Sequence, residues 1–266
     1  MKKIKDTDYL CLSSYLQAKM ARRGEGAADK AAVYRELSTM APDPLILHFF
    51  RLKYDYHNAK VCLKSIATGS DNSRLLLPLG RFPAAQLTEA VRTEDFRSFP
   101  AVFAGAMKES AETLNRTADP RLADFILDRA YVKEMQDTAE QSGSRFLSEY
   151  AALQADALNL RALTRMLKSG VRPEQLKNVL TDCGSVSPAA VTDAYPDAAA
   201  VFARYRGTRL APSLPEAEKA VRGEGFTAFE AAVRACLDSF MDSAKYVCFG
   251  ESVLIRYLYQ LEEQGA

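Results

Sequence analysis

Hydrophobic residues recur every three or four positions along most of the chain, which is the spacing of one face of an α-helix. The longest such stretch contains Phe146, Tyr150, Leu153, Ala157, Leu160 and Leu167. The same spacing predicts helices over residues 9–20 and 123–135, and it returns in Leu254, Tyr257, Leu258 and Leu261. In the 123–135 helix we expect Leu122, Phe125 and Ile126 to face inward. No segment alternates as a half-buried strand does, so we predict an all-α protein with short loops.

Clusters of Gly, Pro, Asp and Ser interrupt this pattern and predict the loops, because these residues favour turns and helix caps. The clusters lie at residues 41–44, 68–73, 77–80, 119–120, 182–188 and 210–215. Asp43 precedes Pro44 and Ser187 precedes Pro188, which is the order of an N-cap followed by proline in the first helical turn. We therefore expect a capped helix to begin at each of these prolines.

An internal repeat is the most informative pattern in the chain. Residues 55–60 read Asp-Tyr-His-Asn-Ala-Lys and residues 156–161 read Asp-Ala-Leu-Asn-Leu-Arg, so Asp-x-x-Asn-x-basic occurs twice. A second basic residue follows four places later in both copies, as Lys64 and Arg165. The two copies therefore share four polar positions: Asp55, Asn58, Lys60 and Lys64 match Asp156, Asn159, Arg161 and Arg165.

Further matches follow the motif along the chain. Gly80 corresponds to Gly184, and the residues after it match in order: Leu87 with Val191, Thr88 with Thr192 and Glu89 with Asp193. A fainter third copy pairs Tyr257 with Tyr150 and places Glu263 at the position of Asp156. We predict a single domain over 1–266 with approximate repeats at 1–99, 100–205 and 206–266, the third of them incomplete.

The spacing of the repeated polar residues predicts how they point. Residues three apart on a helix share a face, so Asp55 and Asn58 lie together, while Lys60 and Lys64 form a ridge turned away from Asp55. The functional interpretation is that these positions bind a partner or join lobes. The structural interpretation is that the acid and the amide bridge to a neighbouring helix inside the fold, while the basic ridge is solvated.

Composition narrows the function classes. With 48% hydrophobic residues the chain can bury a large core. Lysine and arginine number 35 against 34 aspartate and glutamate, so no global field favours nucleic acid or an anionic bilayer, and we predict neither as a partner. No apolar run approaches the roughly 20 residues that span a bilayer, and no apolar stretch follows the basic start as in a signal peptide. Any membrane association is therefore expected to run through a protein partner.

Residues for catalysis or metal binding do not combine into a recognisable site. The five cysteines lack metal-knuckle spacing and are expected to be reduced and mostly buried, as Cys11, Cys62, Cys183, Cys236 and Cys248. His48 and His57 would lie on opposite sides of one helix, so we predict no metal. No nucleophile has a histidine base at a known spacing, and residues 22–26 resemble a flexible surface connection more than a phosphate loop. We predict no cofactor and no catalytic residue.

An ordered series of segments resembles one family, the C subunits of prokaryotic V-type (A/V-type) ATPases and ATP synthases, whose eukaryotic relative is the d subunit of the vacuolar proton pump. The segments are residues 6–10, 49–60, 156–161 and 249–258, and they cover nearly the whole chain. The resemblance implies an all-helical funnel of three lobes around a pseudo-threefold axis. It also implies a non-catalytic socket at the cytoplasmic face of the membrane, between the central-stalk subunits and the rotor ring, which couples ATP hydrolysis or synthesis to proton or sodium transport.

Members of this family are usually longer, and two places in this chain are expected to be short. A helical segment is missing around residues 21–30, and the third repeat stops at Ala266 before its Asn-x-basic continuation. Two other classes remain open at the level of sequence. Stacked helical units also form concave surfaces in adaptors that bind other protein partners. An all-helical enzyme would need a pocket that gathers His57, Asp55 and another acid.

Overall fold

The computed structural model describes residues 4–21 and 29–263, and within these ranges the chain forms helices and no β-strand. The prediction of an all-α protein is confirmed. The expected surface connection at residues 22–26, most of the shortened segment at 21–30 and the last residues, 264–266, lie outside the described residues. The three-lobed funnel stays a prediction.

The chain divides into two compact units. Unit 1 comprises residues 1–144 and 247–266, and unit 2 comprises residues 145–246. These boundaries differ from the predicted repeat boundaries after residues 99 and 205. Unit 1 is therefore built from both ends of the sequence, while unit 2 is continuous.

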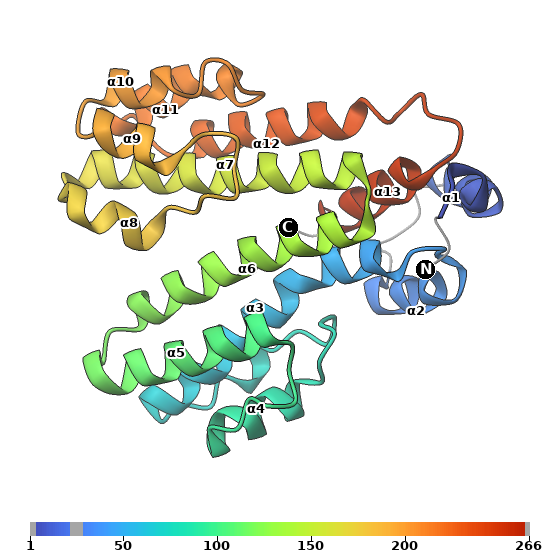
Figure 1. Ribbon diagram of the computed structural model, residues 1–266, viewed down its shortest axis with the longest axis horizontal. Helices are drawn as coiled ribbons and strands as arrows, with labels where there is room; N and C mark the ends of the chain where they lie inside the picture. Colours follow the sequence, from blue (N-terminus) through green and yellow to red (C-terminus); the bar gives the residue numbers. More distant parts are fainter. Residues whose placement is uncertain (1–3, 22–28, 264–266) are drawn as a thin grey trace. The chain divides into compact units, whose positions relative to one another are not determined.

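Unit 1 is a group of helices packed around α3. Its elements are the 3-10 helix η1 (Asp6–Tyr9), α1 (Leu10–Ala21), α2 (Lys30–Met40), α3 (Pro44–Thr68), the 3-10 helix η2 (Ser73–Leu75), α4 (Ala84–Thr93), α5 (Ala101–Thr117), α6 (Pro120–Ser142) and α13 (Glu251–Glu263). Helix α6 packs between α3 and α5, and α13 contacts both α1 and α3 (Figure 1). Helix α13 thus lies beside α1, although the two are far apart in the sequence.

The ends of α3 follow from its sequence. The carboxylate of Asp43 accepts a hydrogen bond from Leu45 N at 2.9 Å, and Pro44 occupies the first turn, as predicted. Gly69 ends the helix with φ 63°, a left-handed conformation that glycine adopts without a Cβ penalty. A helix of 25 residues results, long enough to carry the first Asp-x-x-Asn motif in its middle.

Aromatic side chains fill the core of unit 1 between α3, α5 and the loop that precedes α4. Phe103 is fully buried and meets Tyr56 with 5.0 Å between ring centroids, and Phe82 meets Phe99 edge-on at 4.9 Å. Such contacts contribute about 0.5–1.5 kcal/mol beyond the area they bury. They fix α5 and the loop against α3.

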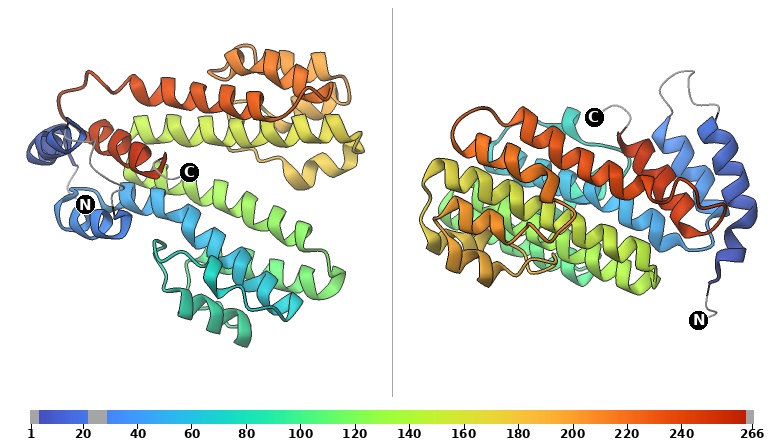
Figure 2. Two further views of the ribbon diagram at one scale, coloured as in Figure 1. Left: turned by 180° about the vertical axis from the view of Figure 1, so that it is seen from behind. Right: turned by 90° about the horizontal axis from the view of Figure 1, so that it is seen from above.

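Unit 2 is organised around α7, which carries the second motif. Its elements are α7 (Arg145–Ser169), η3 (Pro173–Gln175), α8 (Leu176–Val179), α9 (Pro188–Ala194), α10 (Ala198–Ala203), η4 (Ala211–Ser213), α11 (Leu214–Val221) and α12 (Thr227–Asp242). Helices α11 and α12 contact α7, and α12 runs alongside it (Figure 2). Phe240 of α12 stacks on Phe146 of α7 with 4.7 Å between centroids.

Two local predictions were wrong. Helix α9 begins at Pro188, but the Ser187 side chain makes no capping hydrogen bond; the residue before it is instead held by Asp156 of α7, which accepts from Val186 N at 3.1 Å. On α6, the inward positions are different from those expected. Ala123 and Leu127 are buried, because they lie on the face that α3 and α5 cover, whereas the predicted Leu122, Phe125 and Ile126 are only half-buried.

Over residues 4–21 and 29–263, no helix combines the length and the apolar character needed to cross a bilayer. All five cysteines are thiols, and three of them, Cys62, Cys183 and Cys236, are buried, as the sequence predicted. Burial raises the pKa of the Cys62 and Cys236 thiols, which keeps them protonated and unreactive.

Candidate functional site: two acid–amide clamps and their basic ridges

The first Asp–Asn pair holds the loop that follows its own helix. Asn58 is fully buried on α3; its Nδ2 donates to Leu77 O at 2.9 Å and its Oδ1 accepts from Leu77 N at 2.8 Å. One turn earlier, Asp55 Oδ1 accepts from Arg81 N at 2.7 Å and from Phe82 N at 3.3 Å. The two side chains thus satisfy the backbone of a loop that has no secondary-structure partner. We call this arrangement the α3 clamp.

The second pair repeats this arrangement in unit 2. Asn159 Nδ2 donates to Thr181 O at 2.7 Å, and its Oδ1 accepts from Thr181 N at 3.0 Å. Asp156 Oδ1 accepts from Val186 N at 3.1 Å, and its other oxygen accepts from Ser185 Oγ at 2.5 Å. Asp156 is 2% and Asn159 3% exposed. This is the α7 clamp, and it shows that the sequence repeat is a repeat of structure.

In each clamped loop, a glycine lies between the backbone held by the asparagine and the backbone held by the aspartate, and it is a steric requirement. A Cβ added to Gly80 would overlap a carboxylate oxygen of Asp55, and one added to Gly184 would overlap that of Asp156. Only glycine leaves room for the carboxylate to reach the next backbone N–H groups. The pairing of Gly80 with Gly184 in the sequence is therefore explained by the clamps.

The helix that follows each loop also matches. Leu87 of α4 and Val191 of α9 are buried at corresponding positions. Thr88 Oγ1 donates to Ala84 O at 3.0 Å, and Thr192 Oγ1 donates to Pro188 O at 2.8 Å. The repeat therefore comprises a long helix, a clamped loop and a short helix.

The clamps differ in the side chain that donates to the buried aspartate, which is charged in one and neutral in the other. In the α3 clamp, Arg81 Nε donates to Asp55 Oδ2 at 2.6 Å, and the same guanidinium pairs with Glu134 of α6 at 2.8 Å. Tyr56 OH also donates to Glu134, at 2.8 Å. Burial raises the pKa of Asp55, while Arg81 and the N–H groups of Arg81 and Phe82 act in the opposite direction. The α7 clamp has Ser185 at the position of Arg81 and thus a neutral donor.

The basic residues of each ridge pair with one or two acids on a neighbouring helix of their own unit. Lys60 Nζ lies 2.5 Å from Asp128 and Lys64 Nζ 2.7 Å from Asp124, both on α6. In unit 2, both bases share one acid. Glu230 of α12 lies 2.6 Å from Arg161 and 3.2 Å from Arg165.

The structure therefore separates the eight predicted positions into two groups. Asp55, Asn58, Asp156 and Asn159 are buried and hold loops of their own unit. The basic residues lie at the surface to differing degrees, with Lys64 42% and Arg165 65% exposed. That the basic positions bind a partner stays a prediction.

A further buried carboxylate lies near the end of α13. The sequence places Glu263 at the position of Asp156, but the buried residue is its neighbour, Glu262, which is 5% exposed. Glu262 accepts hydrogen bonds from Tyr34 OH at 2.6 Å and from Tyr54 OH, and Lys53 Nζ lies 2.7 Å away. These contacts join α13 to α2 and α3.

The charge on Glu262 is favoured by its partners. Burial alone would raise the pKa of Glu262, but Lys53 and the hydrogen bonds from Lys53, Tyr34 and Tyr54 outweigh it, so the pKa lies below the ordinary value of 4.5. Burial, together with Glu262, raises the pKa of both tyrosines. Both phenols therefore remain donors to this carboxylate at neutral pH.

The two histidines occupy separate environments. His57 Nε2 lies 2.9 Å from Leu75 O, and burial lowers the pKa of His48. Within the described part of the chain, no group of three or more His, Cys, Asp or Glu side chains is placed to hold a metal ion.

Sequence reasoning missed the partners of the motif residues. Arg81 and Glu134 carry no repeat signal, because the second copy has serine in place of Arg81. Asp124 and Asp128 could have been found, since their spacing of four matches that of Lys60 and Lys64. A search for complementary i, i+4 charges on neighbouring helices would have paired them.

Together, these features define an all-α repeat protein whose motif residues shape its own loops. The family model described as ATP synthase (C/AC39) subunit matches residues 1–263. The chain belongs to this family, and the resemblance noted from its motifs is confirmed.

A curated relative is the C subunit of the V-type sodium ATPase of Enterococcus hirae. It is 23% identical over 158 residues, which are 59% of this chain and 48% of that protein. The matched region thus spans about half the length of that relative.

Proposed function

We propose that this chain is a non-catalytic subunit of a V-type or A-type rotary ATPase that joins the central stalk to the membrane rotor ring. In this role it transmits torque between ATP hydrolysis or synthesis and proton or sodium transport. The observation that carries the proposal is the match of the ATP synthase (C/AC39) subunit family to residues 1–263. The proposed location is the cytoplasmic face of the membrane, where protein partners hold the chain.

The clamps support a mechanical role. Each one ties a loop to the middle of a long helix through hydrogen bonds to a buried aspartate and a buried asparagine, five in the α3 clamp and four in the α7 clamp. Packed interiors have low compressibility and transmit strain, and a loop fixed in this way adds little compliance. A protein that passes torque needs this property more than it needs a reactive group.

The basic ridges are the motif residues available to a partner. Exposed ion pairs contribute only about 0.2–1 kcal/mol each. Lys64 and Arg165 can therefore leave Asp124 and Glu230 and pair with an acid on a partner at a small cost in free energy. We infer that these two residues contribute to register and on-rate in the assembly more than to affinity.

The test is size-exclusion chromatography with light scattering on this chain mixed with the central-stalk subunits of the same organism. The proposal expects a one-to-one complex. A folded chain that binds neither the stalk subunits nor the detergent-solubilised ring contradicts it.

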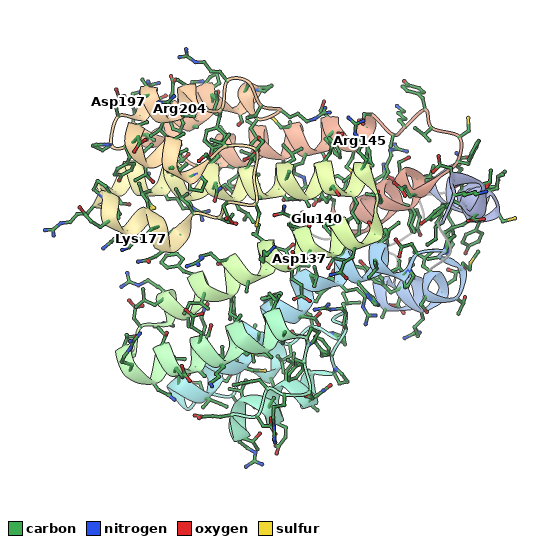
Figure 3. The ribbon with its side chains drawn as sticks, in the orientation of Figure 1. Asp137, Glu140, Arg145, Lys177, Asp197 and Arg204 are labelled. Carbon is green, nitrogen blue, oxygen red and sulfur yellow. The ribbon has the colours of Figure 1, made fainter. Side chains whose placement is uncertain are left out.

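A charge-reversed variant then tests the ridges. Lys64→Glu with Arg165→Glu is expected to weaken the complex with helicity unchanged. Lys177→Glu is the control, because Lys177 is an exposed base on α8 outside the motifs (Figure 3). Equal binding by both variants assigns the ridges to the solvated surface.

A further inference from the structure

Each base of the unit 1 ridge has an acid of its own. Lys60 Nζ lies 2.5 Å from Asp128, and Lys64 Nζ lies 2.7 Å from Asp124. The two acids are four residues apart on α6, as the two lysines are on α3, so the two pairs lie side by side. The charges of this ridge therefore cancel within the unit.

The unit 2 ridge has an aromatic ring where unit 1 has its second acid. Glu230 of α12 corresponds to Asp128 of α6, because each pairs with the first base of its ridge. Four residues earlier, the chain has Phe226 in unit 2 and Asp124 in unit 1. The guanidinium of Arg165 lies over the Phe226 ring, 5.6 Å from its centroid. The second base of this ridge thus meets a ring at the position where unit 1 supplies a carboxylate.

A third base adds to the positive charge of the unit 2 ridge. Lys168 follows Arg165 by one turn on α7, and its Nζ lies 5.4 Å from the centroid of Phe226. Unit 1 has Ala67 at the corresponding position. Among the residues that the structure describes, no acid forms an ion pair with Lys168. We use the name α7–α12 surface for Arg161, Arg165, Lys168, Phe226 and Glu230.

The α7–α12 surface is one continuous patch. Helices α7 and α12 run in opposite directions, so the start of α12 lies beside the end of α7 (Figure 1). Glu230 contacts both Arg161 and Arg165. Phe226 contacts both Arg165 and Lys168. Each member therefore touches the next, and the patch comprises three bases and one acid.

The neighbouring charges leave this surplus of positive charge in place. On α7, the acid before Arg161 is Asp156, which is buried in the α7 clamp and faces its loop. Arg222 and Glu224, in the loop before Phe226, pair with each other at 3.3 Å. The next charged residues after Lys168 and after Glu230 are again one base and one acid in each case: Arg172 and Glu174, and Arg234 and Asp238.

We propose that the α7–α12 surface docks an acidic segment of a protein partner, with an Asp or Glu side chain in the place that Asp124 has in unit 1. Arginine pairs well with carboxylates, and Glu230 is already held by Arg161 and Arg165. Complementary charge of this kind selects a partner. This inference rests on the proposed function, in which the partner is a central-stalk subunit or the rotor ring.

Two other anionic partners fit the surface less well. Single-stranded nucleic acid stacks its bases on open aromatic rings, but Phe226 is half-buried, has two cations over its ring and meets Phe229 edge-on at 5.8 Å. An anionic bilayer is recognised by clusters of about 4–8 bases, whereas this surface has three. An acidic protein segment matches both the small number of bases and the covered ring.

The experiment measures by calorimetry the binding of the full chain to three probes: the purified central-stalk subunits, the detergent-solubilised rotor ring and a poly-glutamate peptide. Arg165→Gln with Lys168→Gln removes two bases. Phe226→Asp restores the acid of unit 1, and aspartate is favourable at this N-cap position of α12. Lys177→Gln with Arg204→Gln is the control with the same change in charge, since both are exposed bases of unit 2 outside the surface (Figure 3).

We expect the Arg165→Gln, Lys168→Gln variant to weaken binding of the stalk subunits or the ring, and of poly-glutamate, about tenfold, because two charged contacts are lost. Phe226→Asp is expected to weaken the same binding about threefold, because the new carboxylate competes with the partner for Arg165. Both effects should diminish with added salt. The control is expected to bind all probes as the wild type does, and circular dichroism melts verify that each variant is folded.

Where the wild type binds the stalk subunits or the ring, unchanged binding by both surface variants overturns the inference, and so does an equal loss in the control. Binding of RNA or of anionic vesicles that the double variant abolishes, with stalk and ring binding unchanged, also overturns it. A wild-type chain that binds poly-glutamate through this surface, but neither stalk nor ring, supports the inference and overturns the proposed function. A chain that binds none of the three probes overturns both.

Discussion

The α3 and α7 clamps hold their loops by corresponding hydrogen bonds, but they differ in electrostatics. Both use an asparagine amide to pair with one backbone peptide and an aspartate to accept from the loop after a glycine. Only the α3 clamp balances its carboxylate with a buried guanidinium. The repeat therefore preserves how the loop backbone is held, while the donor to the aspartate is charged in one copy and neutral in the other.

The side chain that donates to the aspartate also determines how many elements each clamp connects. Arg81 connects Asp55 to Glu134 and thereby fastens the loop to α6 as well as to α3. The Ser185 hydroxyl donates to Asp156 and thus connects its loop to α7. A defect in the α3 clamp is therefore expected to loosen three elements, and one in the α7 clamp to loosen only the loop.

The largest expected effect comes from removing the charged donor. Arg81→Met leaves Asp55 and Glu134 buried without their cation, and breaking a buried pair in this way costs about 3–5 kcal/mol. Ser185→Ala removes one hydrogen bond and is expected to cost about 1–3 kcal/mol. Hydrogen exchange of the α3 and α7 amides measures the free energy of opening of each unit separately.

The control for this comparison is Arg92→Met, which removes an exposed arginine paired with Glu89 on α4. Its expected effect lies within about 0.5 kcal/mol. Equal losses for Arg81→Met and Ser185→Ala would mean that the buried guanidinium adds nothing beyond a hydrogen bond.

The next effect tests the shared geometry. Gly80→Ala and Gly184→Ala both drive a methyl group into a carboxylate oxygen, and overpacking of this kind costs about 1–3 kcal/mol. Because the clash is steric, we expect similar losses in the two units. Denaturation monitored by exchange in each unit checks this, with Gly105→Ala as control, since no atom lies within 4 Å of an added Cβ there. A clear difference between the losses of unfolding free energy in the two variants would show that the two glycines are not under the same steric requirement.

Glu262 is a further buried carboxylate with its own charged partner, Lys53. Its pKa is lowered in the fold, so its contribution to the free energy of unfolding is complete above the ordinary value of 4.5 and is lost as the pH falls through the folded-state pKa. We expect Glu262→Gln to be less stable than the wild type at pH 7, by about 1–3 kcal/mol. The difference should shrink as the pH falls below 4.5, and denaturant melts at both pH values measure it. A difference that grows on acidification would contradict the sign.

The smallest effects are expected at the basic ridges. Lys60→Met and Arg161→Met each remove a surface ion pair, worth about 0.2–1 kcal/mol. Arg161 shares Glu230 with Arg165, so its loss is partly compensated, while Lys60 has Asp128 to itself among the ion pairs of this ridge. Thermal melts at low and high salt check this order. An effect that does not diminish with added salt would show that packing of the side-chain stem dominates.

The sequence predicted the periodic features of the fold well. Helical spacing located α1, α6, α7 and α13, and the proline and glycine signals located both ends of α3 and the starts of α6 and α9. It also aligned Gly80 with Gly184, because a steric requirement leaves the same residue in both copies. The repeated positions could be found in the sequence because the same contact requires the same residue type in both copies.

Features that depend on tertiary contacts could not be derived in this way. Spacing predicted that Asp55 and Asn58 share a face, but it could not say that this face would meet their own loop. The choice between Glu262 and Glu263 depends on where Tyr34 and Tyr54 lie, and both come from distant parts of the chain. Likewise, the inward face of α6 is set by the approach of α3 and α5.

The discontinuity of unit 1 has a consequence for synthesis of the chain. The hydrogen bond from Tyr34 to Glu262 spans 228 residues, so a ribosome adds the acceptor long after the donor. Unit 2 is continuous and can complete its own packing before α13 has left the exit tunnel. Until α13 is synthesised, Tyr34 and Tyr54 lack their acceptor, Glu262. The apolar side chains of α1 and α3 that α13 covers are then exposed, and a chaperone can bind them.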